Sequence, residues 1–424
     1  GEVVGDVTVH TYGGVAGSMT MASLNRVGKS IVQLHDDNTV QVAGNPYGND
    51  LLPWLVTPSS RFGYIDGSGM LRVAAGTDEN DLSNWTDANT NYRLVGPTAG
   101  SATIPAGTIN TMGFEATANG QQETITLAGP LTVNAGGIVM EGTGGTAFDR
   151  IITGGSLTAG NDTLYITTYH LRTQSELRVE SPIVGDTDVV LGGASYVYLE
   201  GTESNTYTGT TYIAGGGDPD HVTKPGMKLN KTDNAVAVPG DLVIMEDAYL
   251  DSLGNQVADT AAVTVNGMYE TGGETIRSLS GSGTVRQGLT VTGGIIAPGN
   301  SVGTLTKDGG TLTAGDGTDI ELELGAIGDS DLLRFDNGAA LSLSGGVHDL
   351  SILNAGGMEE GFYSLMEFWD NGALDTSFDT SIYESQLNLV MMDSLFADSY
   401  LDFSQGGILG LQSIRIPEPT SLTL

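Results

Sequence analysis

The fold is decided by a pattern that is clearest in the stretches LTVTGGIIAPG (289–299) and GTLTKDGGTLTAG (303–315). In each stretch, a short run of alternating apolar and polar residues leads into a glycine-containing corner, and another short run follows. Strict alternation is typical of a β-strand with one buried face. Glycine adopts the positive φ angles that sharp corners require. These stretches therefore predict short strands joined by tight corners.

The same pattern recurs outward in both directions, for example in TLYITTYHL (163–171), AAVTVNGMYE (261–270) and AALSLSGGVHDLSIL (339–353). Comparable units lie roughly 20 residues apart, which is within the range of solenoid repeats. One unit cannot bury its apolar face alone, whereas units stacked at about 4.8 Å form continuous ladders of Val, Ile and Leu. The sequence predicts an all-β fold: a right-handed parallel β-helix or β-solenoid, with loop insertions and a C-terminal cap.

Two regions interrupt the repeats. One contains Trp54 and Trp85 among prolines and polar residues, and the other contains Trp369 and most of the phenylalanines. Only 18–24 and 384–397 carry a weak helical pattern. We expect an N-terminal strand segment with the first rungs at 1–44, a loop-rich insertion at 45–100, β-solenoid repeats at 101–353, a cap region at 354–413 and a terminal motif at 414–424.

The composition of the chain limits the kinds of molecule that it can bind. The chain has 51 Asp and Glu against 16 Lys and Arg, a formal net charge of −35, together with 63 glycines and no cysteine. Such a surface repels nucleic acid and anionic lipid, and it suits divalent cations such as Ca²⁺. Without cysteine, stability has to come from stacking and burial rather than from disulfides. No stretch of 18 apolar residues is present, so we expect no membrane-spanning helix.

Two motifs resemble those of a known family. ESNTYTGTTYIAGG (203–216) is similar to the NTYTG signature of autotransporter-associated β-strand repeats, also called passenger-associated transport repeats. GGIIAPGNSVGTLTKDGGTLTAG (293–315) resembles the PGNSxGTLT motif of the same passengers. The resemblance covers most of the chain and implies an extracellular or cell-surface protein of a Gram-negative-type bacterium. The signature residues are Asn205, Thr206, Tyr207, Thr208 and Gly209.

The C-terminal residues IRIPEPTSLTL (414–424) resemble the start of a PEP-CTERM sorting signal. Its tripeptide corresponds to Pro417, Glu418 and Pro419. This second resemblance implies sorting at the cell envelope.

Residues that could carry chemistry are few. The acidic clusters DPD (218–220) and GDSD (328–331) could supply carboxylates for glycoside hydrolysis or for Ca²⁺ binding, but such clusters are more typical of solvated turns. The histidines show neither metal-ligand nor triad-like spacing. We therefore expect no catalytic, cofactor-binding or metal-binding residues, and no enzyme activity. The five histidines are His10, His35, His170, His221 and His348.

Aromatic residues offer a candidate ligand platform. Trp54 and Trp85 in the 45–100 region could stack on sugar rings if their faces were exposed. Tyr64 and Tyr92 lie in the same segment, and Tyr196 and a neighbouring tyrosine share one face of a later strand. The alternative for these tyrosines is an in-register aromatic ladder that stabilises the sheet.

Three functions remain open. The first is a structural protein that assembles with itself into a fibre, sheath or matrix, with GEVVGDVTVHTYGG (1–14) as a detached strand for donation. The alternative is an adhesin that binds extracellular polysaccharide or cell surfaces. A polysaccharide-active β-helix enzyme is the third, and it requires convergent carboxylates in a groove.

Overall fold

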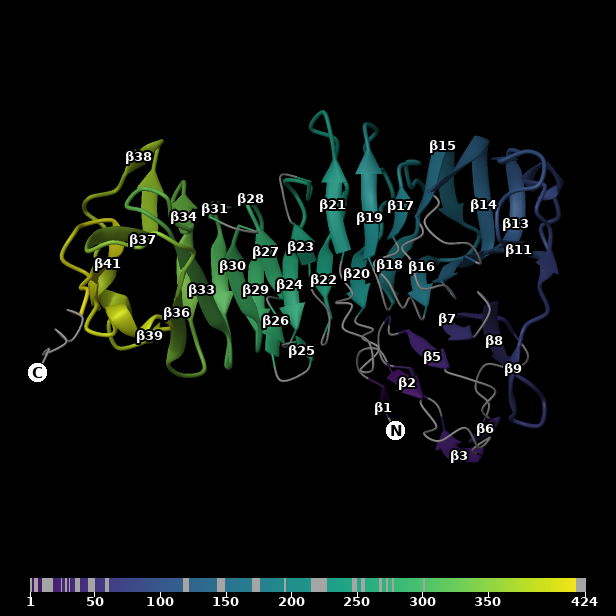
Figure 1. The fold of residues 1–424 in the computed structure, drawn as a ribbon, viewed down its shortest axis with the longest axis horizontal. Helices are drawn as coiled ribbons and strands as arrows, with labels where there is room; N and C mark the ends of the chain where they lie inside the picture. Colours follow the sequence, from purple (N-terminus) through teal and green to yellow (C-terminus); the bar gives the residue numbers. More distant parts are fainter. Residues whose placement is uncertain are drawn as a thin grey trace, which may run out of the picture. The chain divides into compact units, whose positions relative to one another are not determined.

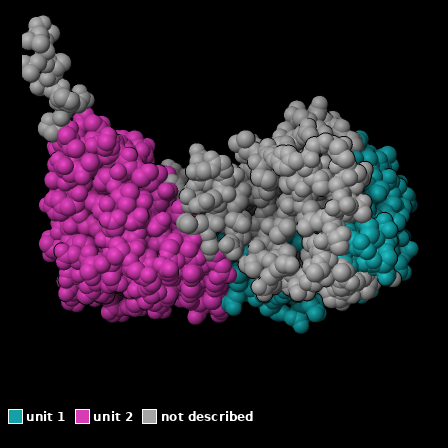
Figure 2. All heavy atoms as spheres, turned by 90° about the horizontal axis from the view of Figure 1, so that it is seen from below, with its two compact units in different colours: residues 1–250, 256–258, 269–275 teal, residues 251–255, 259–268, 276–424 magenta. Residues whose placement is uncertain are grey.

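The chain is almost entirely β-structure and divides into two compact units (Figure 2). Unit 1 comprises 1–250, 256–258 and 269–275; unit 2 comprises 251–255, 259–268 and 276–424. Within the described residues, no helix is long and apolar enough to cross a membrane. The computed structural model describes residues 2–3, 7–9, 18–23, 25–26, 29, 31–34, 39–44, 50–57, 61–116, 122–142, 149–169, 176–193, 196–214, 227–245, 250–252, 256–266, 269–271, 274–276, 278–299 and 302–416.

Unit 1 contains a coil of parallel strands, in which each strand pairs with its equivalent one turn later (Figure 1). The coil has three sides. Two are formed by the strands named below, and the third by short segments such as those in which Leu157 pairs with Ile183. The parallel β-solenoid predicted from the repeats is confirmed. The first side consists of β11 (Asn91–Val95), the later parts of β13 (Gly107–Ala116) and β14 (Glu123–Gly142), β16 (Thr163–Tyr169), β18 (Asp188–Gly193), β20 (Thr211–Ala214) and β22 (Leu242–Ile244). The second side consists of the starts of β14 and β15 (Arg150–Ala159), together with β17 (Glu176–Val179), β19 (Tyr196–Gly201) and β21 (Met227–Lys231).

A ladder of apolar side chains runs through the interior of this coil. Its members pair in register from strand to strand, and none is more than 3% exposed. Burying one such side chain stabilises the fold by about 1.5–3 kcal/mol. Hydrogen bonds between turns join residues that are 22 to 32 positions apart, so the turns are longer than the expected spacing. The ladder on the first side consists of Met112, Ile138, Ile166, Leu191, Ile213 and Ile244.

A second layer of strands covers the outside of the first side. β7 (Leu52–Thr57), β8 (Arg61–Ile65) and β9 (Leu71–Val73) form an antiparallel meander. Its apolar side chains pack with Val139, Tyr165 and Val190, which point out of the coil. The meander approaches closely because Gly137 has no side chain: a Cβ there would lie 2.7 Å from the Phe62 ring. Part of the region expected to be loop-rich is therefore sheet.

Two N-terminal expectations are wrong. β2 (Val7–Val9) pairs in parallel with β5 (Val32–Leu34), which in turn pairs with β7, so this described strand of the 1–14 segment is not detached. The 18–24 segment is not a helix, because β3 (Ser18–Ser23) pairs with β6 (Thr39–Gly44).

Unit 2 contains a coil of the same kind, with three columns of parallel strands (Figure 1). The first column is β24 (Val263–Asn266), β29 (Leu289–Thr292), β32 (Thr311–Ala314) and β35 (Ala340–Leu343). The second is β27 (Leu279–Gly281), β30 (Ile295–Pro298), β33 (Asp319–Leu324), β36 (His348–Asn354) and β39 (Leu387–Met391). The third is β28 (Gly283–Val285), β31 (Thr304–Asp308), β34 (Leu332–Asp336) and β37 (Gly361–Asp370).

The strand direction reverses at the C-terminal end of unit 2. β37 pairs antiparallel with β41 (Ile408–Ser413), and β41 pairs antiparallel with β40 (Tyr400–Asp402). Aromatic side chains stack on one another in this region, and the ring centroids of Phe335 and Phe368 lie 4.7 Å apart. These strands cap the coil. The helix expected at 384–397 is absent, because this segment forms β39 and the 3-10 turn η3 (Ser394–Phe396).

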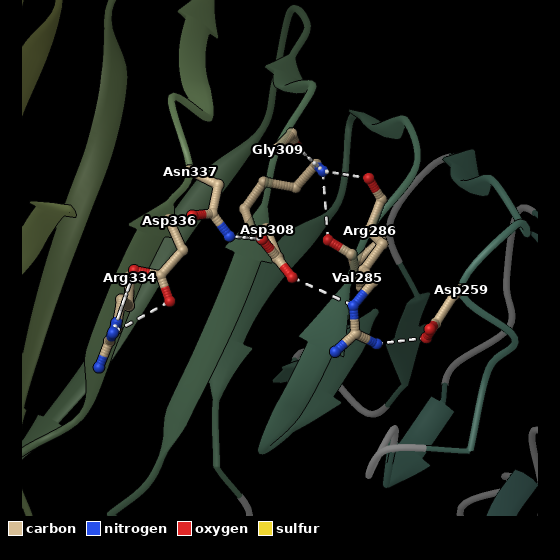
Figure 3. Close-up of polar contacts among 9 residues, drawn as sticks. Asp259, Val285, Arg286, Asp308, Gly309, Arg334, Asp336 and Asn337 are labelled. Carbon is tan, nitrogen blue, oxygen red and sulfur yellow. Dashed lines mark hydrogen bonds and ion pairs between the residues drawn. The ribbon is translucent and has the colours of Figure 1, made fainter. Parts of the chain in front are cut away.

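Polar side chains on the third column of unit 2 join successive turns (Figure 3). Arg286 forms ion pairs with Asp259 and Asp308, and the Asp308 carboxylate also accepts from Asn337 Nδ2 at 2.6 Å. Within β34, Arg334 also pairs with Asp336 at 3.0 Å. Such exposed pairs contribute at most about 1 kcal/mol each, so they add little to the stability of the coil.

Two buried lysines bind backbone carbonyls at the corners of the coils. Lys307 Nζ donates to the carbonyl oxygens of Val285 (3.2 Å), Arg286 (3.3 Å) and Gly309 (Figure 3). In unit 1, Lys231 Nζ donates to the Glu200 carbonyl at 2.9 Å. Burial lowers the pKa of Lys231 to about 8. The Lys307 ammonium thus lies where three corner carbonyls converge, and the Lys231 ammonium binds one carbonyl.

We expect Lys231→Met to change how stability depends on pH. The Lys231 pKa is 10.5 when unshifted and about 8 in the fold, so between these values the unfolded chain binds more protons. The Lys231 contribution to the free energy of unfolding therefore rises with pH across that window. In urea unfolding, the free energy of unfolding of the wild type should rise relative to that of the variant from about pH 8 to pH 10. A constant difference between the two proteins would contradict this.

Candidate binding groove

An open groove of about 400 Å³ lies in unit 1, beside the antiparallel meander. This volume is in the range of small-ligand sites. None of its lining residues is charged, although the chain carries a net charge of −35. The groove is lined by Leu51, Tyr64, Ala74, Ala75, Gly76, Thr77, Asn89, Thr90 and Asn91.

One wall of the groove is held in place by a buried aromatic stack. The Trp85 ring stacks on Tyr92, with ring centroids 5.2 Å apart, and its Nε1 donates to the Glu79 carbonyl at 3.0 Å. The Tyr92 hydroxyl accepts from the backbone N–H groups of Thr86 and Asp87, both at 3.2 Å. This stack therefore fixes the backbone that leads into the lining residues.

Asp87 then shapes the loop itself. Its carboxylate accepts from the backbone N–H of Asn89 at 2.9 Å and from the Thr90 hydroxyl at 3.1 Å. These hydrogen bonds, that of Asn89 first, lower the pKa of Asp87. Asn91 Nδ2 donates to the Ala75 carbonyl at 3.0 Å, which ties the loop to the opposite wall.

Tyr64 on β8 is the one aromatic residue in the lining. Its side chain is half-buried, and its hydroxyl makes no hydrogen bond within the described part of the chain. A partly exposed ring beside amide and hydroxyl groups can stack on an apolar face and can exchange hydrogen bonds with a neutral polar ligand. The groove has the chemistry of a site for an uncharged, hydroxyl-rich molecule.

The predicted platform of Trp54 and Trp85 does not agree with the structure. Trp54 is 5% exposed and Trp85 is 1% exposed. Trp54 belongs to the core between the meander and the coil, and Trp85 belongs to the aromatic stack described above. The two tryptophan rings are part of the interior and are not available to a ligand. Tyr64 and the polar run 89–91 reach the groove instead.

The repeat signature in unit 1 clamps successive turns together. Asn205 Oδ1 accepts from the Ile183 N–H at 2.9 Å, and its Nδ2 donates to the Ala237 carbonyl at 2.7 Å. The Tyr207 hydroxyl, fully buried, bonds to the Thr211 hydroxyl at 2.5 Å. Thr206 and Thr208 donate from their backbone N–H groups to the preceding turn. A Cβ on Gly209 would lie 2.4 Å from the Thr187 carbonyl, so only glycine fits there.

The neighbouring tyrosines on β19 contact cations. The ring centroids of Tyr196 and Tyr198 lie 6.1 Å apart. Lys228 Nζ lies over both rings, at 5.0 and 5.6 Å from their centroids. Arg178 lies 4.9 Å from the Tyr198 ring. Aromatic and cationic groups of successive turns alternate here, in place of a purely aromatic ladder.

Other candidate residues have structural positions. Asp331 of the GDSD cluster lies just before β34, where it is buried and its carboxylate accepts from the Gly303 and Glu323 N–H groups, so this aspartate is not in the expected solvated turn. His348 is buried against the Thr318 carbonyl. Within the described ranges, no three His, Asp or Glu side chains are grouped to hold a metal ion. The following lie outside the described residues: His10, His35, His170, His221, 218–220, Pro417, Glu418 and Pro419.

Comparison with known proteins finds one distant relative, the adhesin BmaC autotransporter of Brucella suis biovar 1 (strain 1330). The chain is 28% identical to it over 328 residues, which cover 73% of this chain and 9% of the adhesin. The chain thus matches a small part of a much longer protein. No family model matches the sequence, and no solved structure matches the fold. The similarity agrees with the resemblance to autotransporter-type repeats and with the β-solenoid.

We expect Asp87→Ala to loosen the groove loop without unfolding unit 1. Loss of the carboxylate removes the acceptor for the Asn89 N–H, so hydrogen exchange at that amide should accelerate roughly tenfold, as expected for one charge-assisted hydrogen bond. Asp375→Ala removes an equivalent acceptor, that of the Ser377 N–H in unit 2, and serves as the control. Exchange at Asn89 that is equally fast in both variants would show that Asp87 does not order the loop.

Proposed function

We propose that this chain is part of a cell-surface adhesin-like protein, and that the groove in unit 1 binds a neutral glycan. The observation that carries the proposal is the uncharged lining of the groove in a chain with a net charge of −35. Surface positions in so acidic a protein are rich in carboxylates, and a cavity that excludes them is suited to a ligand without charge.

The lining supplies the two kinds of contact that sugars need. Asn89, Thr90 and Asn91 bring amide and hydroxyl groups that pair with sugar hydroxyls, and Tyr64 brings a ring that stacks on the apolar face of a pyranose. The loop is held by Asp87 and Tyr92, so part of its conformational entropy is lost before binding. Preorganisation of this kind favours affinity.

The similarity to a protein named an adhesin supports the surface role. A solenoid suits that role, because a stack of turns projects a binding region away from its attachment point. The PEP motif at Pro417, Glu418 and Pro419 supports sorting to the envelope of a Gram-negative-type bacterium. We place the protein at the cell surface or outside the cell on these grounds.

Binding without turnover fits this groove best. Glycoside hydrolysis by the common mechanisms needs two carboxyl groups that flank the scissile bond, and the lining contains none. Self-assembly is the second candidate function. It is supported by the edge of β39, with which no other described strand pairs, and not by the N-terminal segment.

Tyr64→Ala should weaken glycan binding about tenfold, which corresponds to about 1.4 kcal/mol. The measurement is a glycan array followed by calorimetric titration of the best neutral ligand, with Asn89→Ala as a second groove variant. The matched control is Tyr400→Ala, which removes a tyrosine of unit 2 that is 53% exposed and is not among the lining residues of the groove. The proposal fails if no neutral glycan binds the wild type, or if Tyr400→Ala weakens binding as much as Tyr64→Ala.

A further inference from the structure

The last strand of the second column in unit 2 has one unpaired edge. β39 pairs with β36 on one side, and no other described strand pairs with its outer side (Figure 1). The Met392 N–H donates to Ile352, and the Gln386 carbonyl accepts from His348. Since peptide groups alternate in direction along a strand, Leu387, Leu389 and Met391 direct their N–H and C=O groups outward.

The residues of β39 are not of the kinds that normally prevent strand pairing. Natural sheets protect an edge with lysine, proline, a bulge or an inward-pointing charge. The sequence of β39 is LNLVM, which contains none of these. Apolar residues that precede and follow β39 in the chain are exposed: Ile382 is 53% exposed, Met392 is 65% exposed and Leu395 is 40% exposed. Backbone donors and acceptors thus lie beside exposed apolar surface, a combination that marks an interaction site.

We infer that β39 pairs with β39 of a second copy of the chain, in antiparallel orientation about a two-fold axis at Leu389. This register places each Leu387 opposite Met391 of the other copy and pairs all three outward peptide groups. An identical strand always satisfies such a register, because a two-fold contact is self-complementary. The absence of charge in β39 matters here, since two copies with a net charge of −35 repel each other elsewhere.

Pairing of this kind produces a dimer and does not continue to a third copy. A contact between identical patches makes a dimer, whereas a filament requires a second, different patch. At the other end of the same sheet, in unit 1, the last described strand is β10 (Thr77–Asp78), which carries a charge at its edge: Asp78 forms an ion pair with Arg93. The inference therefore narrows self-assembly from a fibre to a pair, and it does not depend on glycan binding in the groove.

The test compares two glutamate substitutions in the full chain. Val390 and Ser351 are register partners on β39 and β36, and both side chains point away from the coil interior. Val390→Glu adds a charge at the proposed interface, where it faces β39 of the other copy. Ser351→Glu adds the same charge to the same face one strand further in. By sedimentation velocity, the wild type and Ser351→Glu should be dimers, and Val390→Glu should raise the dimer dissociation constant at least tenfold.

A cysteine variant tests the register directly. The chain has no cysteine, so any disulfide in Leu389→Cys has to join two copies. Hydrogen-bonded partners in antiparallel strands have Cα atoms about 5.5 Å apart, which permits a disulfide. Oxidised Leu389→Cys should run as a covalent dimer, and Ser351→Cys should not. The inference is overturned if the wild type sediments as a monomer at every concentration, if Val390→Glu remains as dimeric as Ser351→Glu, or if both cysteine variants crosslink equally.

Discussion

Every part of this protein depends on one constraint: the side chains inside the coil have to stack on their equivalents one turn later. The column from Met112 to Ile244 shows this in unit 1, where buried apolar residues pair strand after strand. A single turn could not bury such a face, so stability is shared between neighbours. Because the turns need only match inside the coil, their outer loops are free to differ in length and chemistry.

The same constraint explains the polar residues that are buried. The Asn205 side chain forms hydrogen bonds with the preceding and the following turn. Lys307 Nζ donates hydrogen bonds to three backbone carbonyls at a corner. A backbone that turns a corner leaves carbonyls that the parallel ladder cannot satisfy, and an unpaired buried carbonyl is costly. These side chains supply the missing partners. The NTYTG signature is thus a repeat-joining device in this chain, and ligand chemistry has to be sought outside the coil.

The two units differ from each other in the segments that lie outside their coils. In unit 1, Val139, Tyr165 and Val190 make one outer face apolar, and a second layer of strands covers it. The groove forms at the margin of that layer, where Tyr64 meets the loop 89–91. In unit 2, the coil ends against the antiparallel strands β37, β41 and β40, which leave β39 uncovered among the described strands. The proposed binding groove and the proposed association edge thus both lie where the repeat is interrupted.

The amino-acid sequence by itself determined the parallel solenoid, because alternation and glycine corners act locally and recur in every turn. It also indicated that 45–100 and the C-terminal region depart from the repeat. It could not rank the aromatic residues of 45–100, because burial of Trp54 and Trp85 depends on the layer that packs across the coil. Only the tertiary structure brought Tyr64 to Asn89 and Asn91 and left β39 at an edge. Both outcomes depend on contacts between segments distant in sequence, which no local pattern records.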